Sequence, residues 1–188
     1  MKAALSCMML MYLAAFARAD SLLREDNPDS GLSRWRLSLP ALQLELAQRL
    51  PDQTRGFFLA RGFPAELADD YARSCVFQTI GRNTGSTRPI TLDTRLWRVR
   101  RNAREQPILS KEARLQAWSG KGLSPSAALA FRWATFPTEQ TFQPGDYNWG
   151  MIGFGPQPGE TFDLMLVWFE ADERKTYWIR QLSCAEDK

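Results

Sequence analysis

The pattern of apolar and polar positions divides the chain into three parts. Residues 20–34 are mostly polar, so we expect a flexible polar leader there. Residues 35–74 contain apolar residues at helical spacing, whereas apolar residues in 75–188 mostly recur at spacing two. The pattern therefore predicts a single domain over residues 35–188, in which a helical cap (35–74) packs on a β-sandwich (75–188).

The expected helices of the cap follow from leucine spacing and proline positions. Leu42, Leu46 and Leu50 recur every four residues, which would place them on one face of a first helix. Two further short helices are predicted over residues 52–62 and 64–74, each preceded by or starting at a proline.

Apolar residues at spacing two predict strands in the rest of the chain. The expected strands are residues 75–80, 89–101, 126–136, 147–154, 161–170 and 175–184. Six strands with turn residues between them favour an antiparallel β-sandwich of immunoglobulin-like size. A partly open barrel is the alternative.

Three of these strands have features of their own. Leu129, Phe131 and Trp133 share one parity, so we expect them to face inward from strand 126–136. The apolar parity of strand 89–101 changes near Leu96 and Trp97, which predicts a bulge or bend there. Residues 161–170 are apolar on both sides, which is typical of a strand in the middle of a sheet.

The first residues of the chain have the pattern of a secretory signal peptide. Lys2 is followed by an apolar run and then by Ala17, Arg18 and Ala19. A charged start, an apolar middle and small residues at the cleavage position are the features of such a signal. We expect cleavage after Ala19 and a periplasmic or secreted mature protein without a transmembrane anchor.

Removal of the signal peptide changes the charge of the protein. The whole chain carries 24 basic and 21 acidic side chains. Lys2 and Arg18 belong to the signal peptide, which leaves 22 basic against 21 acidic groups, or +1. A nearly neutral protein gives no electrostatic reason to expect nucleic acid as a partner.

Two cysteines, Cys75 and Cys184, remain after cleavage. An exported protein meets an oxidising compartment, so we expect them to form a disulfide bond. Two free thiols are the alternative.

The absence of histidine excludes several classes of active site. Ser-His-Asp and Cys-His catalysis and histidine-bearing zinc or copper sites all need an imidazole. We expect no cofactor, no metal site and no catalytic residues. A hydrolase that uses a carboxylate pair is the third functional hypothesis, and its candidate carboxylates are Glu139, Asp146, Glu160, Asp163 and Glu170.

Two groups of residues are candidates for binding. Phe142, Tyr147 and Trp149 lie around a Pro-Gly turn, and they belong either to a core strand or to an exposed contact surface. Residues 95–121 hold eight basic and two acidic side chains, either as a solvated face or as a docking face. The arginines of that second group that we single out are Arg98, Arg100 and Arg101.

These observations lead to two functional hypotheses besides the hydrolase. The first is an exported, non-catalytic accessory protein that binds another exported protein through its aromatic edge and its basic stretch. The second is a glycan or small-ligand binding module in which exposed aromatic side chains stack on the ligand.

Overall fold

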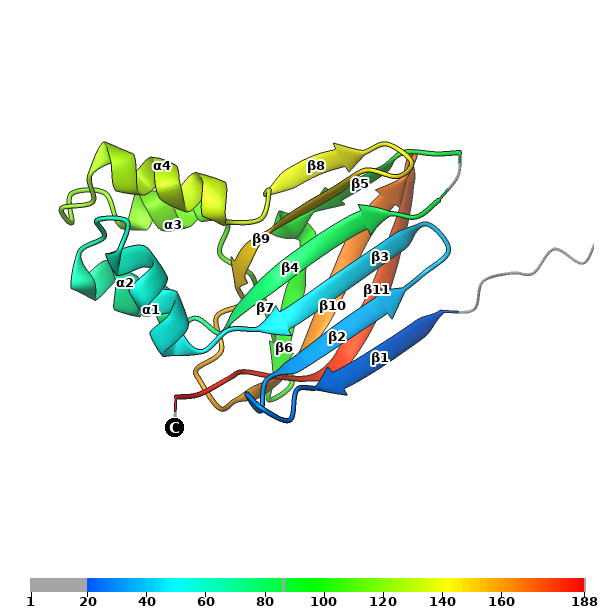
Figure 1. The fold of residues 1–188 in the computed structure, drawn as a ribbon. Helices are drawn as coiled ribbons and strands as arrows, with labels where there is room; N and C mark the ends of the chain where they lie inside the picture. Colours follow the sequence, from blue (N-terminus) through cyan, green and yellow to red (C-terminus); the bar gives the residue numbers. More distant parts are fainter. Residues whose placement is uncertain (1–19, 86, 188) are drawn as a thin grey trace, which may run out of the picture.

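The fold consists of two antiparallel β-sheets that face each other, with helices gathered at one end (Figure 1). The structure is a computed structural model that describes residues 20–85 and 87–187. The expected signal peptide, residues 1–19, lies outside the described residues. The first sheet has the strand order β1-β2-β3-β4-β9. Its strands are β1 (Ser21–Asp26), β2 (Ser33–Ser38), β3 (Leu42–Gln48), β4 (Val76–Asn83) and β9 (Tyr147–Gly153).

The second sheet is built around one central strand, β10 (Thr161–Glu170). Strand β11 (Glu173–Ser183) pairs along one side of β10, and β5 (Ile90–Asp93) and β6 (Arg98–Arg101) pair along the other side. Two short outer strands, β7 (Arg104–Pro107) and β8 (Glu139–Phe142), pair with β6 and β5. The central place of β10 confirms the prediction made from its two apolar sides.

A short 3-10 helix, η1 (Thr94–Leu96), separates β5 from β6. It lies where the apolar parity of the sequence changes, which confirms the expected bend. Trp97 follows η1 and is completely buried, and its indole Nε1 donates a hydrogen bond to the Val167 carbonyl at 3.0 Å. The bend thus allows Trp97 and Val99 to point into the core, although their positions have the opposite parity to that of Leu92.

The main hydrophobic core lies between the two sheets. Strands β2 and β3 contribute alternate buried residues and β4 contributes Phe77, and the aromatic and aliphatic side chains that face them come from β5, β6, β10 and β11 of the second sheet. The larger members of this core are Trp35, Leu37, Leu44, Leu46, Phe77, Trp97, Phe154, Phe162, Leu164, Leu166 and Trp168.

A second hydrophobic cluster lies under the four helices. These are α1 (Pro51–Leu59), α2 (Ala65–Ala72), α3 (Lys111–Ala117) and α4 (Pro125–Ala134). Their aromatic residues pack with Val76 of β4 and Met151 of β9, so the helices cover one end of the first sheet. The aromatic members are Phe58, Phe63, Tyr71, Trp118 and Phe131.

The expected first helix and the expected leader are both wrong. Leu42, Leu44 and Leu46 are buried in β3 at spacing two, while Gln43 and Glu45 between them are only partly buried. A four-residue repeat of leucines fits one face of a helix and also every second inward position of a strand. Leu44 lies at the inward position between them, which fits only the strand. Residues 21–26, expected to be part of a flexible leader, form β1 and pair with β2 along their whole length.

The prediction of a six-stranded sandwich with N-terminal helices needs three corrections. The described residues form eleven strands. Strands β1, β2, β3 and the short β7 and β8 were not expected, and the expected strand 89–101 is divided into β5 and β6. The helices come from two separate segments, since α1 and α2 precede β4 whereas α3 and α4 lie between β7 and β8. The expected strand 126–136 is wrong, because its residues form most of α4.

A disulfide bond joins Cys75 and Cys184, with their Cα atoms 5.2 Å apart. This confirms the expected pairing. Cys75 lies directly before β4 of the first sheet, and Cys184 lies directly after β11 of the second sheet. The bond therefore links the two layers.

Candidate functional site

Four large apolar side chains are exposed where α4 meets β9. Leu129 and Trp133 of α4 are 52% and 78% exposed, and Tyr147 and Trp149 of β9 are 57% and 56% exposed. We refer to these four residues as the aromatic surface. Adjacent apolar side chains that remain in water are typical of a contact site, since single exposed ones are common but clusters are not.

The N-terminal cap of α4 sets the orientation of Leu129 and Trp133. The Ser124 hydroxyl accepts a hydrogen bond from the Ala127 N–H at 3.2 Å, and Pro125 occupies the first turn. Ala127 and Phe131, four residues apart, are buried in the helical cluster. Leu129 and Trp133 therefore point away from this cluster, on the solvent side of the helix.

The alternation of β9 places Tyr147 and Trp149 on the outer face of the first sheet. They lie opposite Arg82 and Ile80 of β4. The Arg82 guanidinium lies 4.7 Å from the centre of the Tyr147 ring, a cation–π contact. Met151 has the same parity but is buried by the helices, so only the first half of β9 presents its side chains to solvent.

A shallow depression of about 370 Å³ lies between the two tryptophans. Leu129, Trp133 and Trp149 supply its apolar part, and its polar lining is formed by Lys111, Arg132, Thr135 and Asn148. The Lys111 ammonium donates to the Arg132 carbonyl at 3.4 Å. Partial burial lowers the pKa of Lys111, and the nearby Glu112 carboxylate opposes this effect.

Of the three predicted aromatic residues, Phe142 does not belong to this surface. It is completely buried in the main core, on β8 of the second sheet. Its proposed role in binding is therefore corrected: Phe142 packs in the interior because it lies opposite Ile90, whose side chain faces the core. Tyr147 and Trp149 are the two that the structure places in solvent.

The predicted arginines lie on β6 of the second sheet and are not brought together with the aromatic surface. Arg100 bonds to Glu105 at 2.5 Å, and its guanidinium lies 3.9 Å from the centre of the Trp178 ring. Arg98 donates to two backbone carbonyls, and Arg101 forms an ion pair with Glu160. The expected combination of an aromatic edge and these arginines in one binding face is not found.

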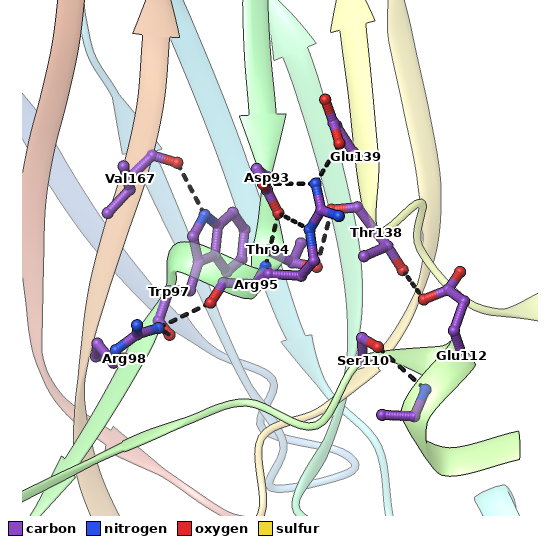
Figure 2. A network of polar contacts seen from close by, with 11 residues as sticks. Asp93, Thr94, Arg95, Trp97, Arg98, Ser110, Glu112, Thr138, Glu139 and Val167 are labelled. Carbon is purple, nitrogen blue, oxygen red and sulfur yellow. Dashed lines mark hydrogen bonds and ion pairs between the residues drawn. The ribbon is translucent and has the colours of Figure 1, made fainter. Parts of the chain in front are cut away.

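A polar network around η1 holds β5, β8 and α3 together (Figure 2). The Arg95 guanidinium bonds to Asp93 at 2.8 Å and also pairs with Glu139. The side-chain hydrogen bond from Arg95 lowers the pKa of Asp93, against the effect of partial burial. At the other end of the network, the Thr138 hydroxyl donates to Glu112 of α3 at 2.5 Å. This network fixes the position of α3, and with it Lys111, beside the aromatic surface.

Each of the five carboxylates proposed for hydrolysis has a partner in the structure. For Asp163, partial burial acts to raise the pKa, but hydrogen bonds from Arg180 and from the Gln181 N–H lower it overall. The partners are Arg95 for Glu139, the Gln143 N–H for Asp146, Arg101 for Glu160, Arg180 for Asp163 and the Trp168 indole for Glu170. These groups stabilise turns and sheet faces.

Two wider properties apply to the part of the chain that the structure describes. Among residues 20–85 and 87–187, no group of three Cys, Asp or Glu side chains is arranged to hold a metal ion. Over the same ranges, no helix is long and apolar enough to cross a membrane.

Half of the aromatic surface was not predicted from the sequence. Leu129 and Trp133 were assigned to the inner face of a strand, and they are the outward residues of a helix. The signal that identifies them is the pair Ser124-Pro125, a helix start, followed by alanines that favour a helix over a strand.

Comparison with known proteins gives no relative from which a role could be transferred to these residues: no protein-family model matches the chain, and no curated protein or solved structure matches it significantly.

Proposed function

We propose that this is an exported, non-catalytic accessory protein that binds another exported protein through the aromatic surface. The observation that carries the proposal is the exposure of Leu129, Trp133, Tyr147 and Trp149, each by more than half, at one junction of helix and sheet. Tryptophan and tyrosine contribute more binding energy than most residues when a partner buries them.

The charges around the aromatic surface favour an acidic partner. Lys111 and Arg132 line the depression beside the tryptophans, and Arg82 stacks on Tyr147. A partner that presents apolar side chains within a rim of carboxylates would match both features. The disulfide between Cys75 and Cys184 supports the export part of the proposal, since such bonds persist in oxidising compartments.

The test compares variants of the full chain in the exported fraction of its native cells. A photo-crosslinking amino acid at position 132 would capture whatever lies beside the aromatic surface. We expect one stoichiometric protein adduct, with its yield reduced about tenfold or more by Trp133→Ala combined with Trp149→Ala. The control is Leu23→Ala, because Leu23 is also 50% exposed but lies on β1, at the opposite edge of the same sheet.

Equal crosslinking in the double variant and in the control would contradict the proposal. So would a heterogeneous set of adducts that does not depend on the tryptophans. Circular dichroism of each variant would show that a loss of adduct is not a loss of folding.

The depression between Trp133 and Trp149 favours a second candidate, an acidic oligosaccharide. Indole faces stack on sugar rings, and Lys111 could pair with a uronic acid carboxylate. Titration with oligogalacturonate would then change the tryptophan fluorescence of the wild-type protein and not that of Trp149→Ala. A fluorescence change of this kind without a protein adduct would favour the glycan over the protein partner.

A further inference from the structure

A second cavity lies between α2, α3 and the second sheet. Its volume is about 400 Å³. Its wall comes from five separate segments, which are α2, β6, β7, α3 and the chain that follows β9. The charged residues that line it are Arg73, Arg101, Arg114 and Asp70, and we call it the arginine cavity. It shares no lining residue with the depression of the aromatic surface.

Arg114 is the unusual residue of this cavity. It is only 6% exposed, although it carries a permanent positive charge. Its face lies against the Tyr71 ring, with 5.1 Å between the guanidinium carbon and the ring centre. Within the described residues, its guanidinium makes one hydrogen bond, from Nη1 to Asp70 Oδ2 at 3.3 Å. Nε and Nη2 make no hydrogen bond to the described residues and are not sealed from solvent, so both are available to a ligand that enters the cavity.

The bond to Asp70 is a weak compensation for burying this charge. The same Asp70 oxygen accepts a shorter hydrogen bond, 2.9 Å, from the Trp118 indole. The Asp70 side chain is 55% exposed, so water competes for it. A buried guanidinium is stabilised by acceptors that match its planar fork, and a carboxylate can satisfy two of its N–H groups at once.

The other charges of the wall do not supply such an acceptor. Arg101 is paired with Glu160, and Arg73 is paired with Asp69 at 2.8 Å. Tyr71 is neutral, because burial raises the pKa of its hydroxyl. Of the four charged residues that line the cavity itself, three are arginines and one is an aspartate.

The remaining wall combines apolar residues with neutral polar ones. Val99 and Phe154 are buried residues whose surfaces border the cavity, and Pro107 lies beside them. Gln106 and Gln157 are the neutral polar residues with long side chains that line the cavity. An inorganic anion would leave the apolar residues without contacts, whereas an organic acid would use both the arginines and the apolar residues.

We propose that the arginine cavity is a binding site for a small organic carboxylate. The carboxylate would pair with the Arg114 guanidinium through Nε and Nη2, and the apolar body of the ligand would lie against Val99, Phe154 and Pro107. This site is separate from the aromatic surface, so it does not depend on the function proposed above.

The test measures binding to the purified mature chain with probes that separate charge from shape. Acetate, hexanoate, benzoate and succinate are the carboxylate probes, benzamide is the uncharged match for benzoate, and phosphate is the inorganic anion. We expect hexanoate or benzoate at about 10 mM to raise the midpoint of thermal unfolding, because a ligand that binds the folded state stabilises it. We expect no comparable shift with benzamide or phosphate.

Matched arginine variants locate the site. Arg114→Gln should weaken binding about tenfold or more, since it removes a charge-assisted contact. Arg101→Gln should weaken it less, and it is the variant to use if Arg114→Gln does not fold. Arg104→Gln is the control, because Arg104 is an exposed residue on the neighbouring strand that does not line the cavity.

Three results would overturn the inference. The first is the absence of any shift with all four carboxylates. The second is an equal response to phosphate and benzoate, which would mean unspecific binding of anions. The third is binding that Arg114→Gln and Arg101→Gln leave at the level of Arg104→Gln.

Discussion

Cys75 and Cys184 connect the start of β4 to the end of β11 by a covalent bond across the two sheets. The two residues are 109 positions apart in the sequence. The loop that the bond closes contains all of the second sheet, as well as α3 and α4.

Removing this bond should lower the stability of the protein markedly. For the double variant Cys75→Ala and Cys184→Ala, the chain-entropy model predicts a loss of about 4–5 kcal/mol in the free energy of unfolding. Urea unfolding followed by circular dichroism would measure the loss, and the folded baseline should keep its strand signal. Two titratable thiols in the unreduced, denatured wild-type protein would show instead that the bond does not form.

Gly150 lies where the chain that leaves α4 crosses β9. A Cβ atom at this position would be 2.3 Å from the Phe136 backbone nitrogen, and Phe136 itself is held there by a hydrogen bond to the Met151 carbonyl at 3.1 Å. We therefore expect Gly150→Ala to destabilise the protein by about 1–3 kcal/mol, the usual cost of overpacking.

Gly56 in α1 provides the control for Gly150. A Cβ atom at this position would meet no atom within 4 Å. Since alanine is the better helix former, Gly56→Ala should stabilise the protein by about 0.5–1 kcal/mol. Chemical unfolding of both variants would test the pair, and a neutral Gly150→Ala would show that β9 does not approach Phe136 so closely.

The contribution of Asp93 to stability should depend on pH. Its carboxylate accepts hydrogen bonds from the Arg95 side chain and from the Arg95 N–H, and its pKa is lowered in the folded state. A lowered carboxyl pKa stabilises the fold at pH values above the unfolded pKa, and this stabilisation is lost as the pH falls through the folded pKa. Asp93→Asn should therefore cost about 1 kcal/mol or less at pH 7, and this difference should shrink below about pH 4.

Urea unfolding of Asp93→Asn and wild type at pH 7 and pH 3 would measure this effect. Asp172→Asn is the control, because Asp172 is exposed in the turn between β10 and β11. A cost of Asp93→Asn that is equal at both pH values would mean that the ion pair with Arg95 contributes nothing.

The parts of the fold that could be predicted are those in which one local signal has no competitor. The two apolar sides of residues 161–170 fit only a central strand, and Pro51 and Pro64 mark the starts of α1 and α2. In contrast, leucines at positions 42 and 46 satisfy both a helix and a strand, and so do Leu129 and Trp133. At these positions the choice depended on weaker signals, Leu44 in the first case and Ser124 in the second.

The aromatic surface and the arginine cavity were less accessible to prediction than the fold. Tyr147 and Trp149 could be named as an alternative to core residues, but their exposure depends on where the helices end above β9. The arginine cavity could not be predicted, because its wall combines residues of the ranges 70–74, 99–114 and 153–157, which lie far apart in the sequence. The sequence does not show whether an arginine is buried or solvated. Only the packing around Arg114 in the folded chain distinguishes it from the solvated arginines.

The central position of β10 has a consequence for the order in which the protein can fold. Strands β1 to β4 follow one another as neighbours, interrupted by α1 and α2, so most of the first sheet can assemble from the N-terminal half of the chain. Until residues 161–170 are synthesised, β6 can pair only with β7 of its own hairpin, and β5 can pair only with the short and distant β8. Until then the apolar inner face of the first sheet stays open to water, which favours aggregation. A chain that is synthesised from its N-terminus can therefore complete its fold only late in synthesis. Until then its exposed apolar surface needs protection from aggregation.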